Sequence, residues 1–562
     1  MEKRRLDWKF LFVFGLAVLS ACASPIVPEE EEEEADPAEV AIGERLFQET
    51  RFAQFFFANS AGVNQALAVG DPVLDISETL AAALPGPFAG KSMNCAACHL
   101  VDQQLNVSGG GMRTYTDFAE RSPIPAREDG KTHAPRNSPP LVNSALPRPG
   151  DLFLHFDGEF ATMPDLVKGT LTGRNFGWLP GEADTAIAHV AKIIREDDGL
   201  GDIAQSFDGL AYRTLLTGTD PNIPADFRLP PEFRIDVASA SDQQIFEAVA
   251  KLVSVYVNQL IFSQDARGNF NLSPFDEFLR LNELPRQPEA GESDLDYSRR
   301  LLAAVDNLPN PVFVAAGSKS FAFHDQPFEF GPAELEGMRI FFREPSALPL
   351  PPTEVAGGGI GNCIACHAAP AFSDFSFHNT GATQREYNGL HGDGAFQALF
   401  VPDYAARQAD PQAWLPASAL YPNGTGVFLS IPQADRPELT DLGLWNVFAN
   451  DAVSKPQAGL RDLLCRRLND VNSPCTAQEL LPLALAAFKT PGLRDLGHSD
   501  PYMHNGKFPT LEAVALHYLQ FSEQARNGGM RNPPAEFQGM ALRGENLPLL
   551  VKFLDSLNED YE

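Results

Sequence analysis

The chain is poor in basic residues, poor in cysteine and without a long apolar run. Lys and Arg total 43 against 74 Asp and Glu, which leaves a net charge of −31, and only 7 of the 562 residues are cysteine. Nucleic-acid binding needs a basic surface that neutralises phosphates, so this charge argues against a nucleic-acid partner and favours a small basic protein. An apolar run at residues 10–19 is too short to cross a bilayer as a permanent helix.

The N-terminal residues are typical of an export signal, with basic residues 3–5 ahead of the apolar run. The segment at residues 19–22 resembles the bacterial lipoprotein lipobox, in which the cysteine becomes the acylated first residue of the mature chain. We therefore expect residues 1–22 to be a lipoprotein signal peptide and Cys22 to be a lipid anchor, with an ordinary signal peptide as the alternative. Ala23 after the cysteine resembles lipoproteins of the outer membrane, which face the periplasm or the cell surface.

Residues 23–40 form a Pro-rich acidic linker with consecutive glutamates at residues 29–34. Mutual repulsion keeps such a run extended and solvated. We expect it to be a tether between the anchor and the folded part, without a binding role of its own.

Two short motifs have the spacing Cys-x-x-Cys-His, which is the signal for attachment of a c-type haem. The thiols bond to the haem vinyl groups and the histidine reaches the iron as proximal ligand. A zinc or redox pair is the alternative, but zinc needs four N or S ligands, no second cysteine pair lies close by, and the histidine would be unexplained. The sequence predicts two covalently bound c-type haems, held by Cys95, Cys98 and His99 and by Cys363, Cys366 and His367.

The remaining cysteines, Cys465 and Cys475, lie in a polar segment that could fold back as a loop. Export makes a disulfide between them plausible. Two free buried thiols are the alternative, because the sequence does not give the distance between their Cα atoms.

An internal repeat organises the chain from residue 41 onward. Residues 156–163 align without a gap with residues 504–511, and similar apolar patterns precede both haem motifs. Apolar periodicity is helical at residues 245–261 and 546–557, and strand signals are sparse. We expect a mainly α fold with two tandem cytochrome c-type haem domains and long loops, at 41–327 with a helical extension and at 328–562 with an insertion that carries the last cysteine pair.

Longer stretches resemble the bacterial dihaem cytochrome c peroxidase and MauG-type family, above all residues 361–381, 441–445 and 488–506. The resemblance implies two haem domains with a calcium ion between them, and reduction of hydrogen peroxide with electrons from a small basic redox protein, a cytochrome c or a cupredoxin. MauG-like oxidation of a Trp or Tyr on a partner protein is an alternative. A third possibility is an electron-transfer protein without catalysis, in which both haems are fully ligated.

The resemblance places the distal ligand of the second haem at Tyr518, as in the MauG type, where peroxidases of the family carry Met. Phenolate oxygen stabilises ferric iron and lowers the potential. His517 and Met503 are alternative ligands, and simple packing of Tyr518 on an amphipathic helix is another interpretation.

For the first haem, the resemblance places His133 near the position of a removable distal histidine, although it could equally line a pocket or lie in an exposed loop. Phe156 stands where the family usually has a Trp between the haems. The carboxylate that assists O–O cleavage falls at Phe176, so Glu159 or Glu182 would have to substitute as the catalytic proton carrier.

The calcium ligands implied by the resemblance map to oxygen atoms of Asn137, Ser499 and Pro501, and oxygen ligation is right for calcium. The family's internal histidines correspond to His378 and His504. We expect both of them to have hydrogen-bonded roles in the core rather than to bind iron.

Overall fold

The computed structural model describes residues 36–76, 92–99, 121–318, 327–468 and 475–560. From Pro37 onward they belong to one unit. The predicted signal peptide, Cys22 and residues 23–35 of the predicted linker lie outside the described residues, and the last three residues of that linker are helical, because the first helix begins at Ala38. Within the described residues, no helix has the length and apolar character needed to span a membrane.

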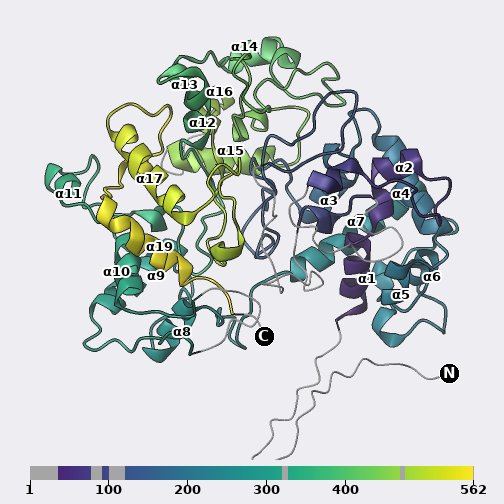
Figure 1. The fold of residues 1–562 in the computed structure, drawn as a ribbon, viewed down its shortest axis with the longest axis horizontal. Helices are drawn as coiled ribbons and strands as arrows, with labels where there is room; N and C mark the ends of the chain where they lie inside the picture. The colour runs from purple at the N-terminus through teal and green to yellow at the C-terminus, as the bar shows by residue number, and fades with distance from the viewer. Residues whose placement is uncertain (1–35, 77–91, 100–120, 319–326, 469–474, 561–562) are drawn as a thin grey trace, which may run out of the picture. The chain divides into compact units, whose positions relative to one another are not determined.

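The structure is mainly helical, as predicted, and the only strands among the described residues are two-residue segments (Figure 1). The helices of the first half are α1 (Ala38–Phe47), α2 (Gln54–Asn59), α3 (Met163–Leu171), α4 (Ala183–Glu196), α5 (Asp202–Ser206), α6 (Tyr212–Thr217) and α7 (Asp242–Gln259). Those of the second half are α8 (Pro274–Leu281), α9 (Asp294–Asp306), α10 (Pro332–Phe342), α11 (Pro352–Gly357), α17 (Leu511–Arg526), α18 (Ala535–Gln538) and α19 (Leu547–Asp555). The insertion holds α12 (Ala382–His391), α13 (Ala395–Ala398), α14 (Tyr404–Ala409), α15 (Gln457–Leu468) and α16 (Ala477–Leu480), between strands β1 (Phe377–His378) and β2 (Phe488–Lys489).

The two halves repeat one packing arrangement. Helix α1 packs on α7 in the first half, and α10 packs on α19 in the second (Figure 1). Both crossings are close: a Cβ on Gly43 would collide with the carbonyl oxygen of Leu252, and one on Gly337 with the carbonyl oxygen of Leu549. Glycine is needed at each crossing because only a hydrogen fits between the two backbones.

The repeat also extends to helix starts and turns. Thr162 caps α3 by accepting a hydrogen bond from the Asp165 N–H, and Thr510 caps α17 in the same way through the Ala513 N–H. Just before each cap lies a short antiparallel bridge, Leu154 with Phe160 and Tyr502 with Phe508. The internal repeat inferred from the sequence is therefore present as repeated structure.

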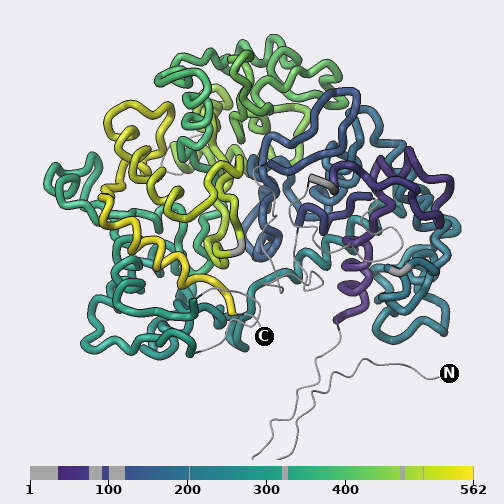
Figure 2. Tube along the Cα trace, viewed as in Figure 1, coloured from purple at the N-terminus to yellow at the C-terminus, as the bar shows by residue number. Residues whose placement is uncertain are grey.

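Three hydrophobic cores organise the described residues. The first runs from Val40 to Phe270, the second from Phe275 to Leu557, and the third joins Phe153 to residues 377–487 of the insertion. In Figure 2 the teal chain of α8 to α10 lies beside the yellow α19, as the shared second core requires. Helices α8 and α9 therefore pack with the second half, and the change of core falls between Phe270 and Phe275, earlier than the boundary predicted near Phe328.

The structure joins Cys465 at the end of α15 to Cys475 in a disulfide, with a Cα–Cα distance of 5.7 Å. Both residues contact the third core. The disulfide closes the loop inside the insertion, away from the haem motifs.

Candidate functional site

The first motif is a single 3-10 turn, Cys95–Ala97, that packs on the first core. Asn94 caps this turn, because its side-chain oxygen accepts a hydrogen bond from the Ala97 N–H at 2.9 Å. Burial lowers the pKa of His99 to about 4, and the ring is hydrogen-bonded to the backbone carbonyl of Pro139. The ring is therefore neutral and oriented by the polypeptide, as a metal-binding histidine must be.

The second motif is also a 3-10 turn, Cys363–Ala365, although Asn362 before it does not cap the turn as Asn94 does. The His367 Nδ1–H donates to the carbonyl of Phe372 at 2.8 Å, and the carbonyl of Pro491 is a second acceptor. Pro491 is the counterpart of Pro139 in the repeat. Because Nδ1 is engaged, the lone pair of Nε2 is left for iron.

The residues of both motifs fit covalent haem. Neither cysteine pair is oxidised to a disulfide, so each offers two thiols beside an oriented histidine. Among the described residues, no cluster unites both thiols of a motif with further Cys or His side chains, as a zinc site would require. Cys366 does meet His378 and Asp374, but His378 Nε2 is bound to Asp374 at 2.7 Å, which is the hydrogen-bonded core role expected for it.

Tyr518 lies beside the second motif. It projects from α17 into the cluster that also contacts Cys363, with its ring 5.3 Å from that of Phe537. Burial raises the pKa of the Tyr518 hydroxyl above its usual value, and the nearby Cys366 and Cys363 add to the effect. The phenol is therefore neutral unless a bound cation favours its ionised form.

The two alternative ligands are placed differently. The His517 Nε2–H donates to the Thr380 carbonyl at 2.9 Å, and burial lowers the pKa of the ring to about 3. Met503 lies in a turn closed by the Gly506 N–H, outside the cluster of Tyr518. Of the three candidates, the structure brings Tyr518 to the second motif.

The repeat makes the two motifs unequal. Continuing the ungapped alignment of residues 156–163 with 504–511 places Thr170 of α3 opposite Tyr518 of α17. A threonine hydroxyl at this position is shorter than a tyrosine and has no acidic phenol to offer iron. The first half therefore has no phenol at the position that Tyr518 occupies in α17.

His155 is a residue near the first motif that the sequence reasoning missed. Its charge contributes to the lowered pKa of His99, and its Nδ1 lies 3.4 Å from Glu159 Oε2. In the repeat His155 stands opposite Met503, and both have left-handed backbone, with φ of 64° and 68°. Extending the sequence alignment of the two halves to Met503 would have identified His155 as its counterpart.

The two candidate carboxylates differ in their surroundings. Glu159 is linked to the first motif through His155. Glu182 instead forms a bidentate pair with Arg127, at 2.9 and 3.0 Å, and accepts from the Leu179 N–H at 2.7 Å. Its oxygens are committed to a structural contact, so Glu159 is the better candidate for proton transfer.

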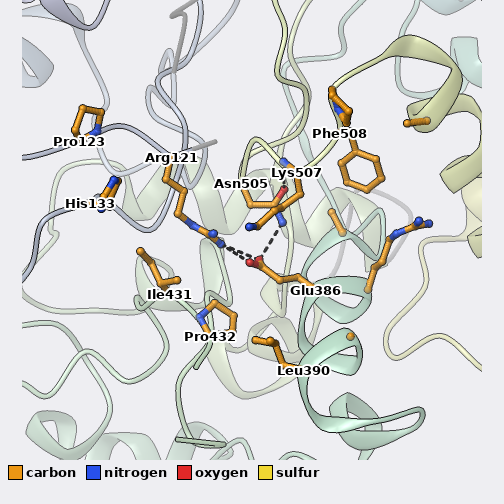
Figure 3. Close-up of a pocket in the computed structure, with 15 residues that line it drawn as sticks. Arg121, Pro123, His133, Glu386, Leu390, Ile431, Pro432, Asn505, Lys507 and Phe508 are labelled. Carbon is orange, nitrogen blue, oxygen red and sulfur yellow. Dashed lines mark hydrogen bonds and ion pairs between the residues drawn. The ribbon is translucent and has the colours of Figure 1, made fainter. Parts of the chain in front are cut away.

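His133 is exposed and lines a cavity of about 870 Å³ between residues of the first and second halves. Figure 3 shows Arg121 and Asn505 directed at Glu386 in this cavity, at 2.8 and 3.0 Å. Neither the first haem motif nor His155 contributes to the lining. This placement fits the pocket-lining alternative, and the ligand role of His133 stays a prediction.

The structure brings two of the three candidate calcium ligands together. Asn137 Nδ2 donates to the Pro501 carbonyl at 2.9 Å, and its Oδ1 accepts from the Ser138 N–H. The Ser499 hydroxyl donates to the Asp495 carbonyl. For the Asn137 oxygen to face an ion beside Pro501, its amide would have to turn over, so the oxygen donors fit calcium only after that change.

The halves meet through equivalent hydrogen bonds. The Asn137 N–H donates to the His504 carbonyl, and its counterpart, the Lys489 N–H, donates to the Phe156 carbonyl, both at 2.8 Å. Arg136 reinforces the junction by pairing with Asp157 and Asp441 at 2.5 Å each. His504 is internal, as expected, with its ring stacked on Phe488 at 3.5 Å.

Two oriented histidines, each beside a thiol pair and set in repeated helical halves, define a c-type dihaem protein. Comparisons with known proteins agree with this class. The chain is 39% identical over 74 residues to the methylamine utilization protein MauG of Methylorubrum extorquens, covering 13% of this chain and 20% of that one. It is 27% identical over 200 residues to the cytochrome-c peroxidase IdrP2 of Denitromonas iodatirespirans, covering 36% and 37%. The chain thus matches less than two fifths of each relative's length, and no family model matches it.

Two solved structures are also similar. The diheme peroxidase BthA from Burkholderia thailandensis aligns with 93% of this chain and 87% of its own, at 16% identity and a TM-score of 0.41. A MauG-like protein associated with microbial copper homeostasis aligns with 94% and 91%, at 15% identity and a TM-score of 0.40. The names of the sequence relatives confirm the resemblance to the dihaem cytochrome c peroxidase and MauG-type family that the motifs indicated.

Proposed function

We propose that this chain is a dihaem oxidoreductase that reduces hydrogen peroxide with electrons from a protein donor. The observation that carries the proposal is the inequality of the two motifs, with Tyr518 beside the second and Thr170 at the matching position of the first. A peroxide-reducing dihaem protein needs one site open to the substrate and one site that stores an oxidising equivalent. Two equal, fully ligated sites would instead suit electron transfer alone.

The residues of the two motifs and Tyr518 have different roles in holding haem. The two thiol pairs hold the cofactors covalently, and His99 and His367 are oriented to bind iron by the carbonyls of Pro139 and of Phe372 and Pro491. Bound haem would supply the iron that exchanges electrons with peroxide and donor. Tyr518 would occupy the open side of the second iron.

Reduction of one peroxide to two waters consumes two electrons and two protons. The donor protein supplies the electrons in successive one-electron steps and is itself oxidised. Glu159 and His155, near the first motif, are groups that can hold and pass a proton there. A net charge of −31 favours a small basic redox protein, a cytochrome c or a cupredoxin, as the donor.

The test is stoichiometric addition of hydrogen peroxide to the purified ferric protein, followed by optical and EPR spectroscopy. The resting protein should contain one high-spin and one low-spin haem, and peroxide should oxidise it. Two low-spin haems that do not respond to peroxide would refute the proposal in favour of an electron-transfer protein without catalysis.

A second candidate function is MauG-like oxidation of a Trp or Tyr on a partner protein, and the position of Tyr518 favours it. Steady-state assays separate the two candidates. Rapid peroxide turnover with a reduced cytochrome c supports the peroxidase. Slow turnover, with mass spectrometry showing an oxidised aromatic residue on a partner, supports the MauG-like reaction.

Export and anchoring by an acylated Cys22, to the outer membrane, belong to the same proposal and rest on the lipobox-like residues 19–22. Cys22→Ala should release the protein from membranes without changing its haem content, because the acidic linker separates the anchor from the fold. Cell fractionation and haem staining measure both, and a variant that stays in the membrane fraction would argue against lipidation.

A calcium ion at the junction of the halves, near Asn137 and Pro501, is a further part of the proposal. A calcium chelator should remove one equivalent of calcium from the protein, as measured by elemental analysis before and after the treatment. Asn137→Ala should lower the calcium content. A native protein that contains no calcium would contradict this part of the proposal.

A further inference from the structure

Two half-buried basic side chains converge on one carbonyl group. Arg148 Nη2 donates to the Leu152 carbonyl at 2.6 Å, and Lys489 Nζ donates to the same oxygen at 2.9 Å. Both also lie over the ring of Phe375, with Arg148 Cζ at 4.2 Å and Lys489 Nζ at 5.9 Å from its centre. Two like charges thus share a single acceptor and a single aromatic face.

Neither cation has a carboxylate partner among the described residues. Arg148 donates otherwise only to the carbonyls of Leu146 and Ser144, and its Nε is buried without a partner. Other buried arginines of this chain are paired with acids: Arg45 with Asp197, Arg136 with Asp157 and Asp441, and Arg494 with Asp276 and Glu559. Arg407 donates to carbonyls alone and its Nε is likewise buried without a partner, but among the described residues no second cation acts on it.

Such a pair is unfavourable without an anion. Burial lowers the pKa of Arg148 to about 10, and burial together with the charge of Arg148 lowers the pKa of Lys489 well below its usual value. Leaving buried charges uncompensated costs several kcal/mol. A carboxylate beside both groups would remove this cost and form charge-assisted hydrogen bonds.

The segments that carry the pair are close in sequence to residues that act on the two motif histidines. Lys489 is two residues before Pro491, whose carbonyl orients His367. Leu152 is three residues before His155, which acts on His99. The Lys489 N–H to Phe156 carbonyl hydrogen bond fixes the two segments to each other at 2.8 Å.

We propose that Arg148 and Lys489 form a carboxylate-binding site that takes the propionate groups of a covalently attached haem. The proposal rests on the haem attachment proposed above. The carboxylates could belong to the first or to the second haem, because residues near the pair in sequence act on the histidines of both motifs. The site positions the cofactor and tunes its potential, because positive charge beside a haem favours the reduced form.

The experiment is an optical potentiometric titration of the intact two-haem protein. Lys489→Gln and Arg148→Gln should each lower the midpoint potential of the same haem, and Lys489→Arg, which keeps the charge, should leave it near the native value. Lys192→Gln is the matched control, because it removes an exposed positive charge paired with Glu196 on α4. Titrations of Cys95→Ala/Cys98→Ala and Cys363→Ala/Cys366→Ala backgrounds identify which haem responds.

The proposal is overturned if Lys489→Gln and Arg148→Gln leave both potentials where Lys192→Gln leaves them, or if Lys489→Arg lowers the potential as much as Lys489→Gln. If the glutamine variants do not fold, the charge-conserving variants Lys489→Arg and Arg148→Lys test the proposal instead. Both must then retain two haems with native midpoint potentials. The measurement is independent of peroxide turnover. A protein that holds haem but does not react with peroxide would refute the proposed function and leave this test intact.

Discussion

Replacing Tyr518 by phenylalanine isolates the single oxygen atom that distinguishes the second motif from the first. Tyr518 lies on α17 beside Cys363, and its hydroxyl has no hydrogen-bond partner among the described residues. Tyr518→Phe therefore keeps the ring in its cluster and removes only the group that would bind iron. We expect the second haem to change from low to high spin and its potential to rise, because an anionic donor that favours ferric iron is gone.

The structure also sets the expected sizes of the effects. If the native protein contains one high-spin haem, as proposed, the high-spin signal per molecule should double. Stability should change by less than about 1 kcal/mol, since no hydrogen bond is lost. Tyr518→Ala would be a poorer probe, because it removes a ring packed against Phe537 and could cost up to about 3–5 kcal/mol.

EPR spectroscopy of the ferric protein measures the spin states, and urea unfolding measures the stability. Thr170→Val is the matched control, because it changes a hydroxyl at the equivalent position of the first half and should leave both haems as they are. An unchanged spectrum in Tyr518→Phe, together with a changed one in His517→Gln or Met503→Leu, would contradict the assignment of Tyr518. It would favour the peroxidase over the MauG-like reaction among the proposed functions.

Three further predictions concern attachment, packing and pH. Cys363→Ala with Cys366→Ala should leave one covalent haem, and a mass corresponding to two would contradict the attachment sites. Gly337→Ala should lower the free energy of unfolding by roughly 1–3 kcal/mol, because its Cβ meets the backbone of α19, whereas Gly357→Ala, which has open space around it, should be neutral. Burial lowers the pKa of His504 to about 3, so that on acidification the ring is protonated in the unfolded state before it is protonated in the folded state. The neutral ring therefore contributes fully to stability above pH 6.5, and the free energy of unfolding should fall by about 2 kcal/mol at pH 5. Urea unfolding at pH 7 and pH 5 measures this, and His504→Gln should reduce the loss.

Local patterns predicted the parts of the fold that depend on neighbours in the sequence. The helical periodicity at residues 245–261 became α7 (Asp242–Gln259), and that at 546–557 became α19 (Leu547–Asp555). The alignment of the two halves anticipated matching caps and bridges, because a repeated sequence repeats its local hydrogen bonds. The predicted boundary near Phe328 differs from the change of hydrophobic core between Phe270 and Phe275, because the local sequence of α8 and α9 does not tell which core they join.

The site was predictable where a motif determines geometry and not where tertiary contacts decide it. Cysteine spacing predicts the attachment residues, and the family resemblance predicts Tyr518 as a ligand; both stay predictions. The position of His155 depends on a left-handed turn, with φ of 64°, that folds it back towards His99. The pairing of Glu182 with Arg127 and the convergence of Lys489 on Arg148 join residues far apart in the chain, and no local pattern encodes them.

Through the exchanged hydrogen bonds at the junction, each half supports part of the backbone of the other. Asn137 stands two residues before Pro139 and Lys489 two residues before Pro491, so the backbone that orients each iron-binding histidine is itself held by the opposite half. A fragment ending before Phe275 would keep its own hydrophobic core and yet lose the support behind His99. We therefore expect haem attachment in one half to depend on the presence of the other half.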